Sequence, residues 1–346
     1  MSLTGHRVES VRVERLNRAE ESLGDLDGIS GGSLTWEASA DLPAGGNLQL
    51  VDIGQTINYS SDRVRIWWSV VGVAEWPLGV YVLAAPTEAH TDAEVTRAIA
   101  LIDKLTVIRE DVITETLQIA KDANIVAAAV AQLRATGEAR VSATDSSKTL
   151  TNAMTWDPGT SRLQVVNDLL AAAGYAALWT DRNGMFRVEP FVEPAQRPVV
   201  WDFTEGETSI HSPNWEYELS LWEASNKVVM TSQANDAGTV FLASVVDANP
   251  LSPTSTVSMG RTLNPIVVEN VEASSQADLE SQALRRLMET SNVAGKVRVS
   301  HAPVPVWFND AVTFASGGRQ MRAAVSRMSL DLRPGALVSA EWRETP

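Results

Sequence analysis

The side chains that could do chemistry in this chain are histidines, serines and carboxylates, because its 346 residues include no cysteine. Disulfides and thiolate metal sites are therefore excluded. The four histidines, His6, His90, His211 and His301, lie far apart, and no HxH or HxxxH spacing pairs two of them for zinc. This spacing favours scattered surface or turn histidines.

Carboxylates close together in the sequence are the next candidates. Asp25 and Asp27 flank Leu26 in GDLDG, and Glu205 and Glu207 stand in TEGET. Either pair could contribute to a cation site. A calcium loop needs more oxygen ligands in register than these stretches offer, so we interpret both as polar turns.

Motifs for catalysis and nucleotide binding are missing from the sequence. There is no GxxxxGK[ST], no GxGxxG and no GxSxG, and no short segment sets a serine beside a histidine and an acid. A triad assembled from distant segments is the alternative that the sequence leaves open. We predict no enzymatic activity, no catalytic, cofactor-binding or metal residues, and no cofactor.

Tryptophan is the abundant aromatic residue. Its large ring suits either a sugar-stacking surface or core packing, and burial is its usual state. Trp67 and Trp68 are neighbours in an expected strand, so one of them faces away from the interior and could anchor an interface. The eleven positions are Trp36, Trp67, Trp68, Trp76, Trp156, Trp179, Trp201, Trp215, Trp222, Trp307 and Trp342.

The net charge of −15 argues against a nucleic-acid-binding protein, which usually shows a basic face. No segment approaches the ~20 apolar residues of a membrane span. The N-terminal MSLTGHRVES lacks the apolar core of a signal peptide, so we expect the chain to be intracellular when made.

The elements that must position these residues begin with strands. In 34–42, LTWEASADL, apolar and polar residues alternate with the period of a half-buried strand. PAGG at 43–46 is expected to turn this strand into a second one. With further strands expected at 11–16, 62–71 and 79–85, residues 8–95 predict a barrel or sandwich.

A mixed α/β region follows over 99–200. Asn124 is the expected N-cap of a helix that ends before Gly137, and a second helix runs from 163 to Gly174. Two strands then flank Asn183-Gly184, a pair suited to a tight turn. Because the well-defined segment 169–191 carries no acid–base pair, we interpret it as presenting a surface at fixed geometry.

Strands return after residue 201 and are interrupted by one helix at 275–291, where Ser275 and Asp278 resemble a capping box. The Pro-, Ser- and Thr-rich stretch 247–266 is expected to be a long exposed loop that could dock a partner. The expected strands are 214–222, 226–232, 295–301, 310–314, 319–332 and 337–342.

The order of these elements resembles minor tail proteins, the baseplate hubs of long-tailed (siphovirus-type) phages of actinobacteria. The similar segments are the N-terminal VRVERLNRAEESLGDLDGISGGSLTWEASADLPAGGNLQLVD, the central SRLQVVNDLLAAAGYAALWTDRNGMFRVEPF, and ADLESQALRRLMETS with PVPVWFNDAVTF and LRPGALVSAEW near the end. Related hubs often have Gly-Asp where this chain has Asn309-Asp310.

The resemblance implies an α+β, mainly β fold with two tail-tube-like β-barrel domains and an inserted α/β domain. The first barrel would be 1–98. The α/β domain would be 99–210, with the loop and helix of 241–294 packed alongside. The second barrel would combine 211–240 with 295–346.

The resemblance also implies a function in the virion, at the tail tip. Three copies would form a ring that continues the tail tube, adapts sixfold to threefold symmetry and lets DNA pass during ejection. The implied partners are two further copies, the distal tail protein and other tail-tip proteins, the tape-measure protein, and genomic DNA passing without sequence-specific binding.

The charge of the chain suggests that an acidic channel wall keeps DNA from adsorbing, although acidity also serves solubility alone. Two alternatives remain open. One is a module that binds host cell-wall carbohydrate through exposed tryptophans. The other is a cell-wall hydrolase domain, for which little length remains before Pro346.

Overall fold

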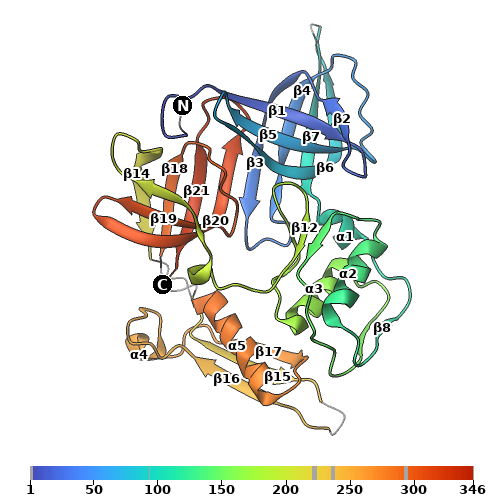
Figure 1. The fold of residues 1–346 in the computed structure, drawn as a ribbon, viewed down its shortest axis with the longest axis vertical. Helices are drawn as coiled ribbons and strands as arrows, with labels where there is room; N and C mark the ends of the chain where they lie inside the picture. The colour runs from blue at the N-terminus through green and yellow to red at the C-terminus, as the bar shows by residue number, and fades with distance from the viewer. Residues whose placement is uncertain (1–2, 93, 220–223, 235–237, 292–294, 346) are drawn as a thin grey trace.

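The computed structural model describes residues 3–92, 94–219, 224–234, 238–291 and 295–345, which fold into a mainly β protein. Four units follow from the pairing of the strands and the hydrophobic clusters. In Figure 1 the strands from the two ends of the chain, blue and red, lie side by side, and the green and orange units are inserted between them in sequence.

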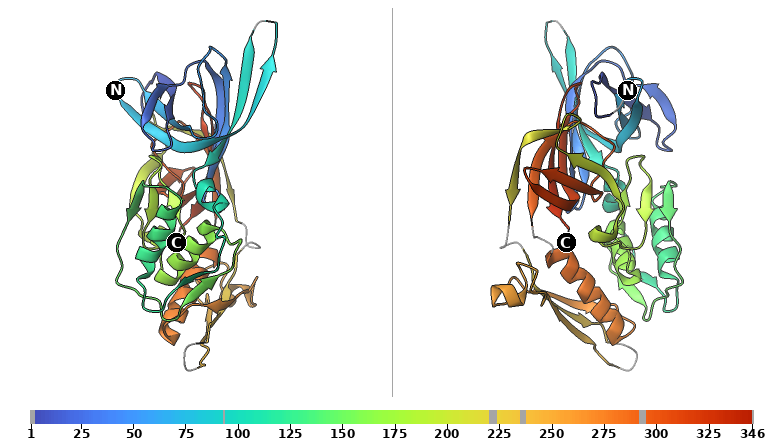
Figure 2. Two further views of the ribbon diagram at one scale, coloured as in Figure 1. Left: turned by 90° about the vertical axis from the view of Figure 1, so that its right-hand side faces the viewer. Right: turned by 60° about the vertical axis from the view of Figure 1, so that its left-hand side comes forward.

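The N-terminal β unit contains the first seven strands. Alternate residues of β5 point inward, so that Val64, Ile66 and Trp68 are fully buried. The hairpin of β6 and β7 projects beyond the body of the protein (Figure 2). The strands are β1 (Glu9–Leu16), β2 (Ser22–Asp25), β3 (Ile29–Glu37), β4 (Ala44–Val51), β5 (Arg63–Val70), β6 (Ala74–His90) and β7 (Val95–Asp103).

The C-terminal β unit contains six strands from the last part of the chain. Its centre is β20, which pairs with both β19 and β21. The strands are β13 (Val199–Thr204), β14 (His211–Glu218), β18 (Lys296–His301), β19 (Ala311–Ser316), β20 (Arg319–Asp331) and β21 (Val338–Glu344). The strand expected over 214–222 thus begins earlier, and its residues 220–222 lie outside the described part.

One antiparallel ladder joins these two β units into a single thirteen-stranded sheet. Strand β3 pairs with β20, with Glu37 opposite Arg327 and Ser33 opposite Asp331. A common hydrophobic core runs beneath both units, and Trp36 and Trp307 meet edge to face across it at 5.7 Å. Within the described residues the strand order is open, from β14 to β2, and no closed barrel forms.

The turn expected at 43–46 is wrong, because residues 44–46 already belong to β4 and the chain reverses at 38–43. Gly45 and Gly46 pair with Thr35 and Leu34. A Cβ at Gly46 would lie 2.1 Å from the carbonyl oxygen of Ser33. These glycines therefore permit close approach of two strands.

The α/β unit has its own core beneath two helices whose ends match the sequence expectation. The Asn124 side chain accepts a hydrogen bond from the Ala127 N–H, and Gly174 ends the second helix with a φ of 79°. The elements are α1 (Thr106–Glu110), β8 (Leu117–Ile119), α2 (Ile125–Ala135), β9 (Val141–Ala143), β10 (Met154–Trp156), α3 (Arg162–Ala173), β11 (Trp179–Thr180), β12 (Phe186–Val188) and the 3₁₀ turn η1 (Pro194–Gln196).

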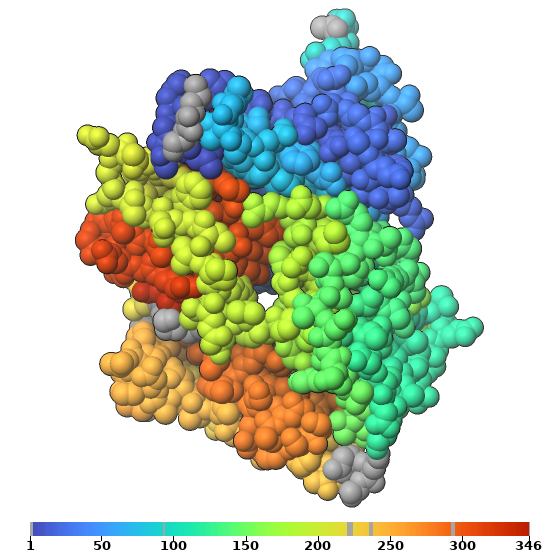
Figure 3. All heavy atoms as spheres, viewed as in Figure 1, coloured from blue at the N-terminus to red at the C-terminus, as the bar shows by residue number. Residues whose placement is uncertain are grey.

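A small unit of three strands and two helices forms one end of the molecule (Figures 1 and 3). Its strand β15 was expected within the second barrel but pairs with β16 and β17 instead. The stretch 247–266 contains a helical turn and buried Thr254 and Ser255, so it is no simple loop. The elements are β15 (Lys227–Ser232), β16 (Leu242–Val246), α4 (Thr256–Met259), β17 (Ile266–Val271) and α5 (Gln276–Ser291).

Candidate functional site

Two of the four histidines are core residues, which corrects the expectation of scattered surface histidines. His211 on β14 and His301 on β18 are register partners, and both are buried. Burial lowers the pKa of His301 to about 4, so its ring is neutral at neutral pH. His90, by contrast, is exposed on the β6–β7 hairpin. The pair packs against Phe203, Phe314 and Trp342 and serves the core.

The neighbouring carboxylates expected to be polar turns are partnered by the protein itself. Asp25 lies on β2 and binds Arg12 at 2.8 Å. Glu205 accepts a hydrogen bond from the Ser316 hydroxyl, which fastens β13 to β19. Across the described residues no group of three His, Asp or Glu side chains is placed to hold a metal ion.

The described tryptophans pack in the interior or lie half-buried. Trp68 is fully buried, whereas Trp67 points to the opposite face, as the strand pattern predicts. Trp67 is half-buried between the guanidinium groups of Arg12 and Arg65, and its indole N–H donates to Glu14. This arrangement favours packing over a flat sugar-stacking platform.

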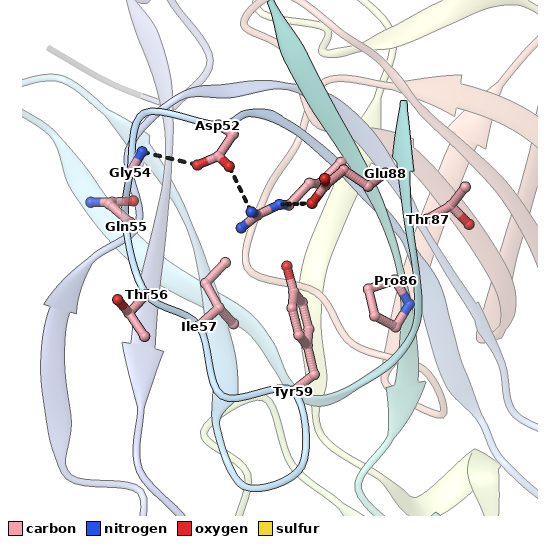
Figure 4. A pocket seen from close by; sticks show the side chains of 10 residues that line it. Asp52, Gly54, Gln55, Thr56, Ile57, Tyr59, Pro86, Thr87 and Glu88 are labelled. Carbon is pink, nitrogen blue, oxygen red and sulfur yellow. Dashed lines mark hydrogen bonds and ion pairs between the residues drawn. The ribbon is translucent and has the colours of Figure 1, made fainter. Parts of the chain in front are cut away.

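An open pocket of about 510 Å³ lies at the base of the β6–β7 hairpin (Figure 4). Arg97 binds Asp52 at 2.6 Å and Glu88 at 3.1 Å. Asp52 also accepts the backbone N–H of Gly54. The three charged side chains form ion pairs with one another, and these pairs connect the 52–59 loop to the hairpin. We therefore assign the wall of the pocket a structural role.

Asp103 has the raised pKa that often marks a catalytic acid. Burial raises the pKa of this carboxyl group to about 6. Its oxygens, however, accept the backbone N–H groups of Ala44 and Leu105 at 2.9 and 2.8 Å. The carboxylate thus fixes the ends of β4 and β7.

A buried cluster of four charged side chains, which we call the charge cluster, joins the N-terminal β unit to the α/β unit. Arg63 donates to Glu20 at 2.9 Å and to Glu138 at 3.1 Å. Lys104 forms ion pairs with the same two carboxylates. The cluster consists of Glu20, Arg63, Lys104 and Glu138, and Arg65 and Arg140 lie at its rim.

The pKa shifts of Lys104 and Glu138 show how these two charges depend on their partners. Burial lowers the pKa of Lys104 below its ordinary value, although Glu20 and Glu138 act in the opposite direction. For Glu138, burial alone would raise the pKa, yet the hydrogen bond from Arg63 and the nearby Lys104 lower it. The cluster is therefore stable only while its opposite charges stay together.

The Asn183-Gly184 turn is the point at which the α/β unit docks. The Lys104 ammonium group donates to the Gly184 carbonyl at 2.8 Å. A Cβ at Gly184 would lie 2.7 Å from the Val80 side chain, so only glycine fits here without rearrangement. On the other side, Arg182 donates to the Pro305 carbonyl at 3.0 Å. The turn therefore contacts both β units. Its well-defined local structure serves to hold the α/β unit against them.

The joined sheet also presents a broad polar face, made of the outward residues of β18, β21, β20, β3 and β4. One row of register partners crosses it as Ser300, Ser339, Ser329 and Thr35. The row beside it carries charge, with Arg298 opposite Glu341, Arg327 opposite Glu341, and Glu37 opposite Arg327. We call this surface the polar face.

Every arginine in the charged row of the polar face is engaged by carboxylates. Arg298 binds Glu218 at 2.7 Å and Glu341 at 3.2 Å. Arg327 binds Glu37 at 2.7 Å. These side chains are solvent-exposed except for the half-buried Glu341, so the pairs add little stability. Their effect is on the charge of the surface: both arginines of the row are paired with carboxylates. The only sequence feature that pointed to the polar face was the period-two alternation of polar and apolar residues in each strand.

Comparison with solved structures identifies the fold of the chain, whereas comparison of its sequence with known families and proteins does not. No family model matches the chain, and no curated protein matches its sequence. Within the part of the chain that is described, no helix is long and apolar enough to cross a membrane.

The solved structures to which the chain is similar include several tail proteins. The chain is similar over 97% of its length to 97% of a tail protein from Neisseria meningitidis (11% identity, TM-score 0.68). It is similar over 96% to 97% of a 43 kDa tail protein of prophage MuSo2 from Shewanella oneidensis (12%, 0.66). It also matches a prophage tail protein, gp18, from Listeria monocytogenes over 95% of this chain and 94% of that one (10%, 0.56). The chain has the fold of these tail proteins.

Proposed function

We propose that the chain is a structural hub of the tail tip, a minor tail protein of a siphovirus-type phage of actinobacteria. Three copies form a ring that continues the tail tube. Each copy contributes two β units, so three copies supply six units, which adapts a sixfold tube to a threefold tip. The observation that carries this proposal is the tail-protein fold with its two β units joined through β3 and β20.

In this proposal the two β units act as the two tube-like domains. The N-terminal β unit ends with β7 at Asp103, and the C-terminal β unit consists of β13, β14 and β18 to β21. The α/β unit, from α1 at Thr106 to η1 at Gln196, and the small unit pack alongside them. Neighbouring copies, the distal tail protein, other tail-tip proteins and the tape-measure protein are the partners. The role is structural, without catalysis.

The polar face is the surface that suits the channel wall. DNA binding is driven by cationic side chains that neutralise phosphates. On this face Arg298 and Arg327 already hold carboxylates. Genomic DNA could pass such a wall without being retained.

The mass of the assembly in the virion tests the hub. Native mass spectrometry or a reconstruction of the tail tip should give three copies around the axis, and a single copy there would contradict the proposal. For the channel wall, the double variant Glu37→Gln with Glu341→Gln removes the carboxylate that Arg327 binds and one of the two that Arg298 binds. The variant ring is expected to retain duplex DNA at low salt, whereas the wild-type ring releases it. Equal retention by both would contradict the assignment of the polar face.

A further inference from the structure

The turn that docks the α/β unit contains the one Asn-Gly pair of the sequence, Asn183-Gly184. In such a pair the main-chain nitrogen of the second residue can attack the side-chain amide carbon of the first. Glycine hinders this attack least, because it has no Cβ. The Asn183 side chain is exposed to the water that the reaction also needs, whereas Gly184 is buried.

The reaction needs only this pair and water. The Gly184 nitrogen gives up its proton and bonds to Cγ of Asn183, and the side-chain nitrogen of Asn183 leaves with that proton as ammonia. The product is a cyclic imide. Water then opens the ring at either of its carbonyl carbons. One opening gives aspartate, and the other gives isoaspartate, in which Cβ of residue 183 has become part of the main chain.

Hydrogen bonds within the turn restrain the nitrogen that would attack. The Gly184 N–H donates to the main-chain carbonyl of Asp181 at 2.8 Å. The Asp181 carboxylate accepts the N–H groups of Asn183 and Met185 at 2.9 and 3.0 Å. The attack requires the Gly184 N–H to leave its acceptor and the peptide group before it to rotate. The contacts of Asp181 oppose both movements.

Docking adds restraint from outside the turn. Lys104 donates to the Gly184 carbonyl at 2.8 Å, and Arg182 donates to the Pro305 carbonyl at 3.0 Å. The Val80 side chain lies 2.7 Å from the point that a Cβ of Gly184 would occupy. The peptide group is therefore confined while the α/β unit lies against the β units. It becomes free to rotate when the docking opens locally.

We propose that Asn183 is a modification site whose deamidation is controlled by docking of the α/β unit. The reaction is slow in the docked chain and fast in an undocked one, and its isoaspartate product prevents docking afterwards. The added main-chain atom lengthens the turn where there is no room even for a Cβ on Gly184, and it displaces the carbonyl that Lys104 binds. This inference concerns the single chain and does not depend on the proposed ring.

The test compares the rate of deamidation at Asn183 in wild type, Lys104→Met and Arg333→Met. Lys104 lies outside the turn, so its replacement changes the docking but not the chemistry of the Asn-Gly pair. If the reaction proceeds through open states, Lys104→Met should react at least about tenfold faster than wild type. The control Arg333→Met breaks only an exposed ion pair and should react at the wild-type rate. Mass spectrometry of the tryptic peptide 183–187 measures the product.

Wild type unfolded in urea gives a reference that does not require any variant to fold. At the same pH and temperature the unfolded chain should deamidate at Asn183 at least about tenfold faster than the native chain. Equal rates in the two states would overturn the proposal. Equal rates for Lys104→Met and Arg333→Met would show that docking does not control the reaction.

Refolding tests the effect of the product. Wild type aged in urea until Asn183 has reacted is separated into its isoaspartate and aspartate forms and refolded, and Asn183→Gln aged in the same way controls for reactions elsewhere. The matched variant Asn183→Asp carries the new charge on a normal main chain. Because this side chain is exposed, Asn183→Asp should keep nearly the wild-type stability in urea. The isoaspartate form should be less stable, and equal stability of the two would refute the block on docking.

Discussion

Replacing Lys104 by methionine should destabilise the protein by about 3–5 kcal/mol, because it removes one partner from a buried set of opposite charges. The Lys104 side chain is fully buried and forms ion pairs with Glu20 and Glu138. It also donates to the Gly184 carbonyl at 2.8 Å. Methionine fills most of the same volume, so the loss reports the charge and the hydrogen bond more than a cavity.

Urea unfolding followed by tryptophan fluorescence at pH 7 measures this change in the free energy of unfolding. The control is Arg333→Met, which breaks an exposed ion pair with Asp331 and should cost less than about 1 kcal/mol. A second comparison combines Lys104→Met with Glu20→Gln. Because the double variant removes one charge of each sign, it should lose about 1–3 kcal/mol less than the sum of the single variants.

The reasoning would be refuted by a Lys104→Met protein as stable as the Arg333→Met control. It would also be refuted by strict additivity of Lys104→Met and Glu20→Gln. Either result would mean that the charge cluster contributes no mutual stabilisation and that the α/β unit is held by apolar packing alone.

Three further results are expected. Gly184→Ala should cost at least about 1 kcal/mol more than Gly159→Ala in thermal or urea unfolding, because both have positive φ but only a Cβ at Gly184 meets another side chain, and equal losses would contradict the docking role. Between pH 7 and pH 5 wild type should lose about 2 kcal/mol more than His301→Phe. The folded pKa of about 4 lies below the unfolded one near 6.5, so stability present above pH 6.5 is lost as the unfolded state gains a proton, and parallel pH curves would exclude this. Asn124→Ala should cost about 1 kcal/mol through its lost N-cap, and unchanged unfolding would show that the cap adds nothing.

Short-range features of the fold were predictable from the sequence. The helix that begins after Asn124 and the one that ends at Gly174 are where their capping residues placed them. The strand pattern also placed Trp67 and Trp68 on opposite faces. Each of these features depends on a few neighbouring residues, whose backbone preferences and hydrogen bonds are the same in any fold.

Partners far apart in the chain were not predictable in this way. Glu37 and Arg327 are separated by 290 positions, yet they pair across the ladder that unites the two β units. His211 and His301 were expected at the surface and meet in the core. A period-two pattern states which side of a strand is apolar but not which strand lies beside it.

The sequence by itself determined that this is a mainly β chain, acidic and free of cysteine, with locally defined helices and turns and no motif for catalysis. Only the tertiary structure decided that Lys104 donates a hydrogen bond to the Asn183-Gly184 turn. It also decided that the polar face is continuous across two β units and that β15 belongs to the small unit. The physical reason is the distance along the chain over which each kind of interaction acts. Capping and alternation act between neighbours, whereas strand choice and charge burial depend on which distant surfaces exclude water together.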